Sequence, residues 1–160
     1  QMSAYIRGVR AALARQQLDG VIFGHAGDGH VHVNPLVDVR RPDWREQVSE
    51  LMTEITALVA ALGGTLAGEH GDGRLRTPLL GEVIPPDTAS LFALVKRCFD
   101  PRGILNPGVK VPLTGQTSLG DIKYDPLLPP LPAPARAALD EIERTRGWGR
   151  FRLSLVGEEG

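Results

Sequence analysis

The sequence predicts an α+β fold in which two strands follow one another between amphipathic helices. Residues 2–18 and 44–62 repeat apolar side chains at helical spacing. Between them, residues 31–34 alternate valine with polar side chains, which is the period of a strand. The order is therefore helix, strand, strand, helix. A chain of 160 residues suits one domain with a real hydrophobic core.

The first helix leads directly into a predicted hairpin. Asp19-Gly20 predicts a turn that ends the helix, and Val21-Ile22-Phe23 has the composition of a short buried strand. After a turn at 26–29, period-two alternation would send Val31 and Val33 to a core. It would place three polar side chains on the opposite face, namely His30, His32 and Asn34.

The longest helix opens at Arg40-Arg41-Pro42-Asp43 and stops at Gly63-Gly64. Residues 65–67 form a brief extended piece. A further helix follows Pro85-Pro86-Asp87, with an apolar face built from Leu91, Phe92, Val95, Cys98 and Phe99. Asp100-Pro101 closes that helix, and residues 104–108 predict a turn.

Composition changes after about Pro112, so we assign residues 114–160 to a Pro-rich tail or linker. Its prolines are too dense for a packed element and predict an extended, polyproline-like strap. Residues 134–146 predict a short charged helix. Residues 148–156 are a weak strand candidate.

Charge and cysteine content exclude several classes of function. A net charge of −1 gives no electrostatic basis for binding nucleic acid or an anionic membrane. The single cysteine, Cys98, excludes an internal disulfide and a cysteine-rich metal cluster. No apolar run is long enough to span a bilayer, and no signal-peptide pattern opens the chain. We expect a cytoplasmic protein, peripheral to a membrane only through partners.

Two glycine-rich stretches, 24–34 and 67–74, contain all four histidines of the chain. A lone histidine more often makes a hydrogen bond than binds a metal. Four histidines beside Glu69 favour a divalent-metal and substrate site, because imidazole nitrogen and carboxylate oxygen are usual ligands of zinc and similar ions. A hairpin would bring His25 and His32 within reach of one ion.

Three motifs occur in a fixed order: Gly-His-Ala-Gly-Asp-Gly-His-Val-His from Gly24, Ala-Gly-Glu-His-Gly-Asp-Gly-Arg from Ala67, and Phe-Asp-Pro-Arg-Gly-Ile-Leu-Asn-Pro-Gly from Phe99. As a set they resemble the C-terminal domain of FAD-linked oxidases, the family of glycolate oxidase, D-lactate dehydrogenase and D-2-hydroxyglutarate dehydrogenase. The chain departs from the family pattern twice. His30 replaces an asparagine, and Val109 intervenes before Lys110.

The resemblance implies an antiparallel sheet with helices packed on one face, in ferredoxin-like style. Residues 1–113 would be the C-terminal part of a substrate domain, and so a partial domain. It also implies site roles. A divalent metal, zinc or manganese, would be held by His25, His32 and Glu69. His70 would be the catalytic base and would contact the substrate together with Asn34.

The same resemblance implies an FAD-dependent oxidation of a D-2-hydroxy acid such as glycolate, D-lactate or 2-hydroxyglutarate. FAD would be bound by a domain absent from this chain, with cofactor contacts from Asn106 and Lys110. The partners would be the substrate, the missing FAD-binding domain and an iron–sulfur domain or subunit, with no nucleic acid. The fragment alone is expected to be inactive and to form a homo-oligomer.

Two rival functions stay open at this point. One is a stand-alone metal-binding or structural module without redox activity. The other is a metal-dependent hydrolase that uses His70 or Glu69 as its base. The third motif, residues 99–108, favours the flavoenzyme because neither rival needs it.

Overall fold

The protein's structure, a computed structural model, describes residues 1–120, 122 and 129–147. The chain divides into two compact units, residues 1–124 and 125–160. The described elements of the first unit are α1 (Met2–Arg15), β1 (Asp19–His25), the 3-10 turn η1 (Ala26–Asp28), β2 (His30–Leu36), α2 (Trp44–Ala61), α3 (Gly73–Arg76), the 3-10 helix η2 (Thr77–Glu82) and α4 (Pro86–Phe99).

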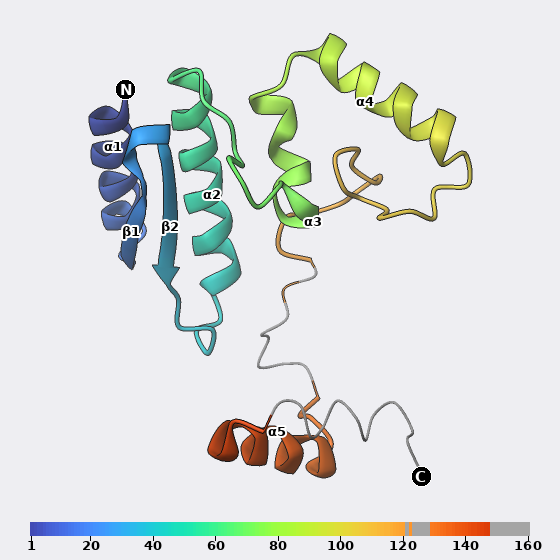
Figure 1. Cartoon of the computed structure of the whole chain (residues 1–160). Helices are drawn as coiled ribbons and strands as arrows, with labels where there is room; N and C mark the ends of the chain where they lie inside the picture. Colours follow the sequence, from blue (N-terminus) through green and yellow to red (C-terminus); the bar gives the residue numbers. More distant parts are fainter. Residues whose placement is uncertain (121, 123–128, 148–160) are drawn as a thin grey trace. The chain divides into compact units, whose positions relative to one another are not determined.

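The strands β1 and β2 form the predicted antiparallel hairpin, in a register that places His25 opposite His30 (Figure 1). The turn between them is η1 followed by Gly29, whose φ of 69° is left-handed. The N–H of Gly29 donates to the carbonyl of Ala26 at 3.2 Å. Gly24 has to be glycine, because a Cβ there would lie 2.2 Å from the carbonyl oxygen of His30.

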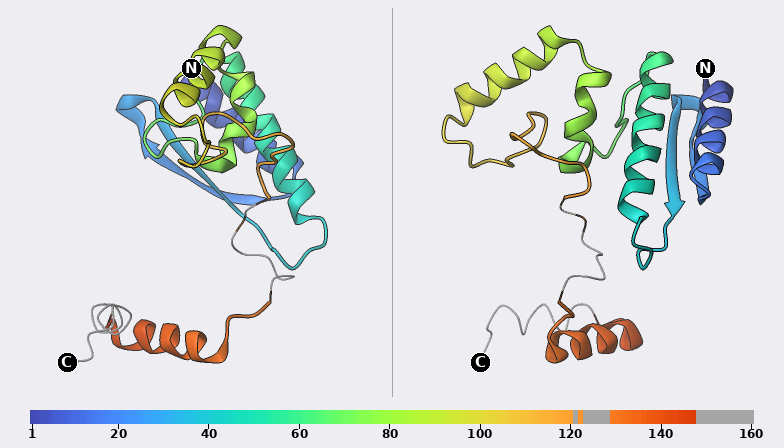
Figure 2. Two further views of the ribbon diagram at one scale, coloured as in Figure 1. Left: turned by 90° about the vertical axis from the view of Figure 1, so that its right-hand side faces the viewer. Right: turned by 180° about the vertical axis from the view of Figure 1, so that it is seen from behind.

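One face of the hairpin is covered by α1 and α2, which lie on the same side of it (Figure 2, left). The buried cluster and the strand residues packed against it comprise Val9, Ala12, Leu13, Leu51, Ile22 and Val33. Full burial of a side chain such as Leu51 contributes about 1.5–3 kcal/mol to folding. This confirms the α+β class, with an antiparallel sheet and helices packed on one face.

The start of the hairpin differs from the prediction in two ways. α1 ends at Arg15, and the turn lies at 16–17, where Gln17 has a φ of 52°. Asp19 and Gly20 already belong to β1, so the predicted turn there is wrong. β1 is also not a buried strand, since Val21 is 53% and Phe23 52% exposed. Helices cover only one face of the hairpin, which leaves these side chains uncovered in the first unit.

The helix α2 begins and ends as its sequence predicts. Asp43 is its N-terminal flanking residue, and its apolar stripe buries Trp44 and Leu51. At the other end Gly63 adopts a φ of 66°, and the N–H of Gly64 donates to the carbonyl of Val59 at 2.9 Å. A left-handed glycine with this hydrogen bond is a common helix stop.

The helix α4 begins at Pro86, as predicted, but none of its residues is buried. Exposed apolar side chains recur along it at Leu91, Leu94, Val95 and Phe99. The predicted apolar face therefore exists and is uncovered within the described residues.

The loop after α4 is organised by Asp100. Its carboxylate accepts hydrogen bonds from the N–H groups of Ile104 and Leu105, at 3.0 and 2.8 Å, and from Nζ of Lys96 at 2.6 Å. The bond from Lys96, helped by the two amides, outweighs burial and lowers the pKa of Asp100 to about 2. These contacts hold the turn that the sequence places at 104–108.

The second unit contains α5 (Ala133–Thr145), which confirms the short helix expected at 134–146. The strand candidate at 148–156 lies outside the described residues, as do residues 123–128. Of the prolines in the predicted strap, Pro129, Pro130 and Pro132 lie in a segment without helix or strand, and Pro134 lies in the first turn of α5. Among the described residues no helix combines the length and apolarity that a membrane span requires. The interpretation of residues 114–160 as a tail or linker stays a prediction.

Candidate functional site

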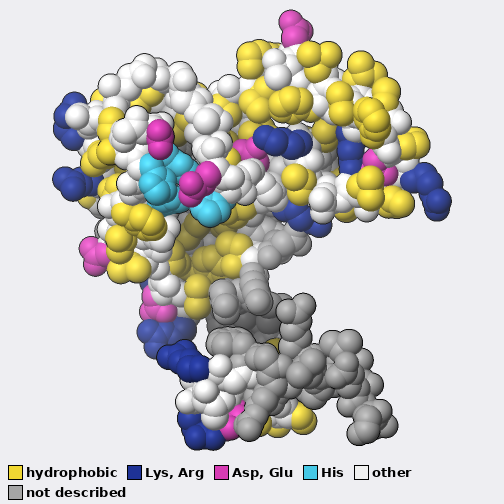
Figure 3. Space-filling view, in the orientation of Figure 1, with side chains coloured by type: hydrophobic (Ala, Val, Ile, Leu, Met, Phe, Trp, Pro, Cys, Tyr) yellow, Lys and Arg dark blue, Asp and Glu magenta, His cyan; other side chains and the backbone are white. Residues whose placement is uncertain are grey.

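Three histidines lie on the hairpin face that the helices leave open. The register puts His25 opposite His30 and Phe23 opposite His32, so their side chains share one face. Figure 3 shows the imidazoles gathered on the surface with a carboxylate beside them. The rings contact one another: His30 and His32 lie 4.6 Å apart between ring centroids, and Phe23 stacks on His32 at 4.9 Å.

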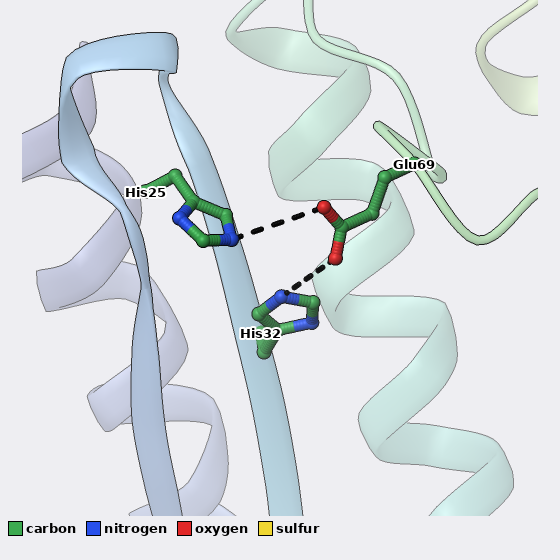
Figure 4. Close-up of side chains that lie close together, drawn as sticks. All are labelled: His25, His32 and Glu69. Atoms are coloured by element: carbon green, nitrogen blue, oxygen red, sulfur yellow. Dashed lines mark ion pairs between the residues drawn. The ribbon is translucent and has the colours of Figure 1, made fainter.

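Glu69 faces these histidines from the segment that joins α2 to α3 (Figure 4). Its Oε1 lies 3.1 Å from Nε2 of His32, and its Oε2 lies 3.8 Å from Nε2 of His25. The fold therefore brings together residues more than thirty positions apart in the sequence. The two histidines are exposed to different degrees, with side-chain exposures of 61% for His25 and 20% for His32.

The two remaining histidines also point at this carboxylate. Nε2 of His70 lies 2.8 Å from Oε1 of Glu69, and Nδ1 of His30 lies 3.7 Å from Oε2. Desolvation raises the pKa of Glu69, but the positive charges that the four surrounding histidines carry when protonated together outweigh it and leave the pKa below its usual value. The carboxylate is therefore ionised at neutral pH, as a metal ligand must be.

The donor atoms of His25, His32 and Glu69 fit a single divalent ion. One ligand atom from each lies within 4.8 Å of the others. Tetrahedral coordination with bonds of about 2.0–2.2 Å sets donor atoms about 3.3–3.5 Å apart. The two histidines lie 3.1 and 3.8 Å from different oxygens of Glu69. Two imidazole nitrogens and one carboxylate oxygen suit zinc and are acceptable to manganese.

The other predicted site residues lie in three different places. His70 is beside Glu69 and has a 73% exposed side chain, so its ring is accessible. Asn34 lies two positions beyond His32 on the same hairpin face, opposite Val21. Asn106 lies in the loop after α4, in a left-handed conformation with φ 45°. The structure thus groups the predicted metal ligands with His70, and places Asn106 in a different loop.

Lys110 makes contacts that the sequence did not suggest. Its Nζ donates to the carboxylate of Asp72, and its backbone N–H donates to Oγ1 of Thr77 at 3.0 Å. The side chain of Asp72 is only 2% exposed. The sequence analysis assigns no role to Asp72, although Asp72 is the aspartate of the second Gly-Asp-Gly triplet. His30 was named in the cluster without a role, and its place opposite His25 follows from the hairpin register.

A shallow concavity of about 360 Å³ lies at the junction of α1 and β1. Arg10, Leu13, Gly20 and Ile22 help to line it. Ile22 belongs to the helix-covered face of the hairpin, so this concavity is separate from the histidines. The candidate site is instead the group of histidines and Glu69 on the surface of the hairpin.

Comparison with known proteins gives a consistent family. The model of the C-terminal domain of FAD-linked oxidases matches residues 1–109. Glycolate oxidase subunit GlcD of Bacillus subtilis is 34% identical over 108 residues, which are 68% of this chain and 23% of that protein. D-lactate dehydrogenase of Archaeoglobus fulgidus is 40% identical over 88 residues, 55% of this chain and 19% of that protein.

An uncharacterised FAD-linked oxidoreductase of Mycobacterium tuberculosis is 42% identical over 108 residues, 68% of this chain and 22% of that protein. The chain thus covers less than a quarter of the length of each of these relatives. The match over residues 1–109 includes both glycine-rich stretches with the four histidines and Glu69. The chain belongs to the family of FAD-linked oxidases, as their C-terminal domain.

Proposed function

We propose that this chain supplies the metal- and substrate-binding part of an FAD-dependent oxidoreductase that oxidises a D-2-hydroxy acid. The family membership supports the flavin chemistry, and the names of the relatives point to substrates of the glycolate and D-lactate type. A 2-hydroxyglutarate-like acid is the third candidate. The observation that supports the metal is the convergence of His25, His32 and Glu69.

The reaction removes a proton from the hydroxyl of the substrate and a hydride from its α-carbon. FAD, bound by another domain of the same protein, supplies the hydride acceptor. His25, His32 and Glu69 would hold a divalent ion, which would supply Lewis-acid chemistry to the bound hydroxy acid. The task of this chain is then to orient the hydroxy acid and to accept the hydroxyl proton.

His70 is the proposed acceptor of that proton. Its Nε2 lies 2.8 Å from Oε1 of Glu69, so a ring that has taken up the proton would form an ion pair with this carboxylate. The carboxylate would thereby stabilise the charged ring, because a nearby opposite charge favours the charged form. Asn34 lies on the same hairpin face as His32 and offers an amide to the substrate.

The test is flavin reduction in the full-length protein that contains this chain. Under anaerobic conditions the flavin absorbance should bleach when a D-2-hydroxy acid is added, while the L enantiomer should leave it unchanged. The variant His25→Ala is the control, and its flavin should bind normally but bleach slowly. The proposal would be contradicted if the bound flavin is reduced neither by glycolate nor by either enantiomer of lactate or 2-hydroxyglutarate. That result would favour a module without redox activity.

A further inference from the structure

The segment that presents Glu69 has little structure of its own. Within the described part of the chain, residues 65–71 form no backbone–backbone hydrogen bond. Upstream, the segment is held by the end of α2 at Gly64. Downstream, the segment is held by Arg76, whose Nη1 donates to the carbonyl of Gly71 and whose N–H donates to the carbonyl of Asp72, both at 3.1 Å. The position of Glu69 therefore depends on these two ends.

Asp72, three positions after Glu69, is anchored through its side chain as well. Its buried carboxylate is ion-paired with Nζ of Lys110, which comes from the loop after α4. Lys110 is fixed in turn, because its N–H donates to Oγ1 of Thr77 at 3.0 Å. Oγ1 of Thr77 itself donates to the carbonyl of Gly73 at 2.6 Å, next to Asp72. The third motif is thus tied to the end of the second.

We propose that Asp72 and Lys110 are positioning residues that hold the Glu69 turn against the hairpin and so set the affinity of the metal site. The proposal rests on the proposed function, because it presumes that His25, His32 and Glu69 bind an ion. In this proposal the role of Lys110 is its ion pair with Asp72. The ion pair acts on the site through the backbone from 69 to 72.

The physical argument is the cost of an unpaired buried charge. Without Lys110, the carboxylate of Asp72 would lack its cation in a position with 2% exposure. Removing one partner of such a pair is costly, whereas replacing both partners by neutral groups is often tolerated. Asp72 should therefore turn toward solvent when Lys110 alone is lost, and the turn that presents Glu69 should move with it.

The rest of this junction should survive that change. Nε2 of Gln116 donates to the carbonyls of Gly108 and Arg74, at 2.9 and 3.1 Å. It thereby links the same two segments without using Asp72 or Lys110. A variant at Lys110 is therefore expected to keep its fold although the carboxylate of Asp72 has lost its ion pair.

The experiment is a zinc titration of the 160-residue chain and its variants by calorimetry, at a temperature where circular dichroism shows each to be folded. Lys110→Met should weaken zinc binding by about tenfold or more, the usual scale for residues that orient a metal ligand. Lys110→Arg should bind like the parent chain. The double variant Asp72→Asn/Lys110→Met should recover much of the lost affinity, because no buried charge is then unpaired.

Lys96→Met is the matched control, since Lys96, in α4, also pairs with a nearly buried aspartate, Asp100, but four positions away and without contact to the second motif. It should lower stability and leave zinc affinity unchanged. Equal zinc affinity in Lys110→Met and the parent chain would overturn the inference and leave the metal site standing. Equal losses in Lys110→Met and Lys96→Met would also overturn it. A parent chain that binds no zinc would overturn the metal site itself and the inference with it.

Discussion

Nε2 of His70 lies 2.8 Å from Oε1 of its neighbour Glu69, so two adjacent residues serve one site. In an extended strand adjacent side chains point to opposite faces. Here residues 68–70 are bends, and Gly71 follows with a φ of 71°. The glycine-rich turn therefore allows a proposed ligand and a proposed base to lie side by side, which a strand would prevent.

The first prediction concerns metal binding by the chain itself. His25→Ala or His32→Ala removes one of three proposed ligands, and either variant should lower zinc or manganese content to a small fraction of the parent value. Metal analysis of dialysed protein gives the measurement. Ser49→Ala, on the exposed surface of α2, is a control that should keep the full content. Unchanged metal in both histidine variants would show that these residues are not ligands.

The second prediction concerns flavin. The family match places residues 1–109 in the C-terminal domain of these oxidases, and the proposed FAD site belongs to another domain. The purified 160-residue chain should therefore be colourless. An absorbance spectrum from about 350 to about 500 nm, which covers the flavin bands, measures this directly. Stoichiometric flavin would show that this chain has a cofactor site of its own.

The third prediction concerns acid stability. The pKa of Asp100 is about 2 in the folded chain, below its ordinary 3.8, so the folded state binds fewer protons in this range. The stabilisation is present above about pH 4 and is lost as the pH falls toward 2. Asp100→Asn should flatten this part of the stability profile in urea unfolding. Asp140→Asn, an exposed ion-pair residue in α5, should not. Parallel profiles for Asp100→Asn and the parent chain would contradict the assignment.

The fourth prediction concerns self-association. α4 exposes Leu91, Leu94 and Val95, and Phe99 is 83% exposed, so a continuous apolar stripe is available for contact. Figure 3 shows apolar side chains gathered over this helix. Exposed patches of this kind mark interaction surfaces. Val95→Lys with Phe99→Ser should reduce oligomers in light scattering and leave the fold intact. A monomeric parent chain at high concentration would refute the prediction.

A matched variant separates this surface effect from loss of folding. Leu51 is 2% exposed and belongs to the core of α1, α2 and the hairpin. Leu51→Ala should therefore cost about 2–5 kcal/mol of stability. The α4 variants should cost much less, because no residue of α4 is buried.

Local sequence signals predicted α1, α2, α4, α5 and the hairpin, but not the short helices α3 and η2. The apolar stripe of α2 and the stop at Gly63-Gly64 depend on neighbours within one or two turns, which the sequence shows directly. The exposure of Phe23 and of the α4 stripe depends on which surfaces other parts of the protein cover. A run such as Val21-Ile22-Phe23 has the same composition whether one or both faces of the strand are packed.

In the candidate site, too, some contacts could be predicted from local sequence and others could not. His25 and His32 could be paired in advance because a hairpin with a short turn fixes their separation. The contact between Lys110 and Asp72 joins residues 38 positions apart through loops, and no periodicity encodes it. The cofactor contact of Lys110 is implied by the resemblance alone and stays a prediction, while the structure pairs its Nζ with Asp72.

The most direct test of the proposed site compares His70→Ala with Glu69→Ala in the full-length protein, measuring turnover and bound metal together. Loss of a general base typically lowers turnover by about 10²–10⁴-fold. His70→Ala should show such a loss with its metal still bound, because His70 is proposed as the base and not as a ligand. Glu69→Ala should lose metal and turnover together. Equal metal loss in both variants would make His70 a ligand and contradict the assignment of the base.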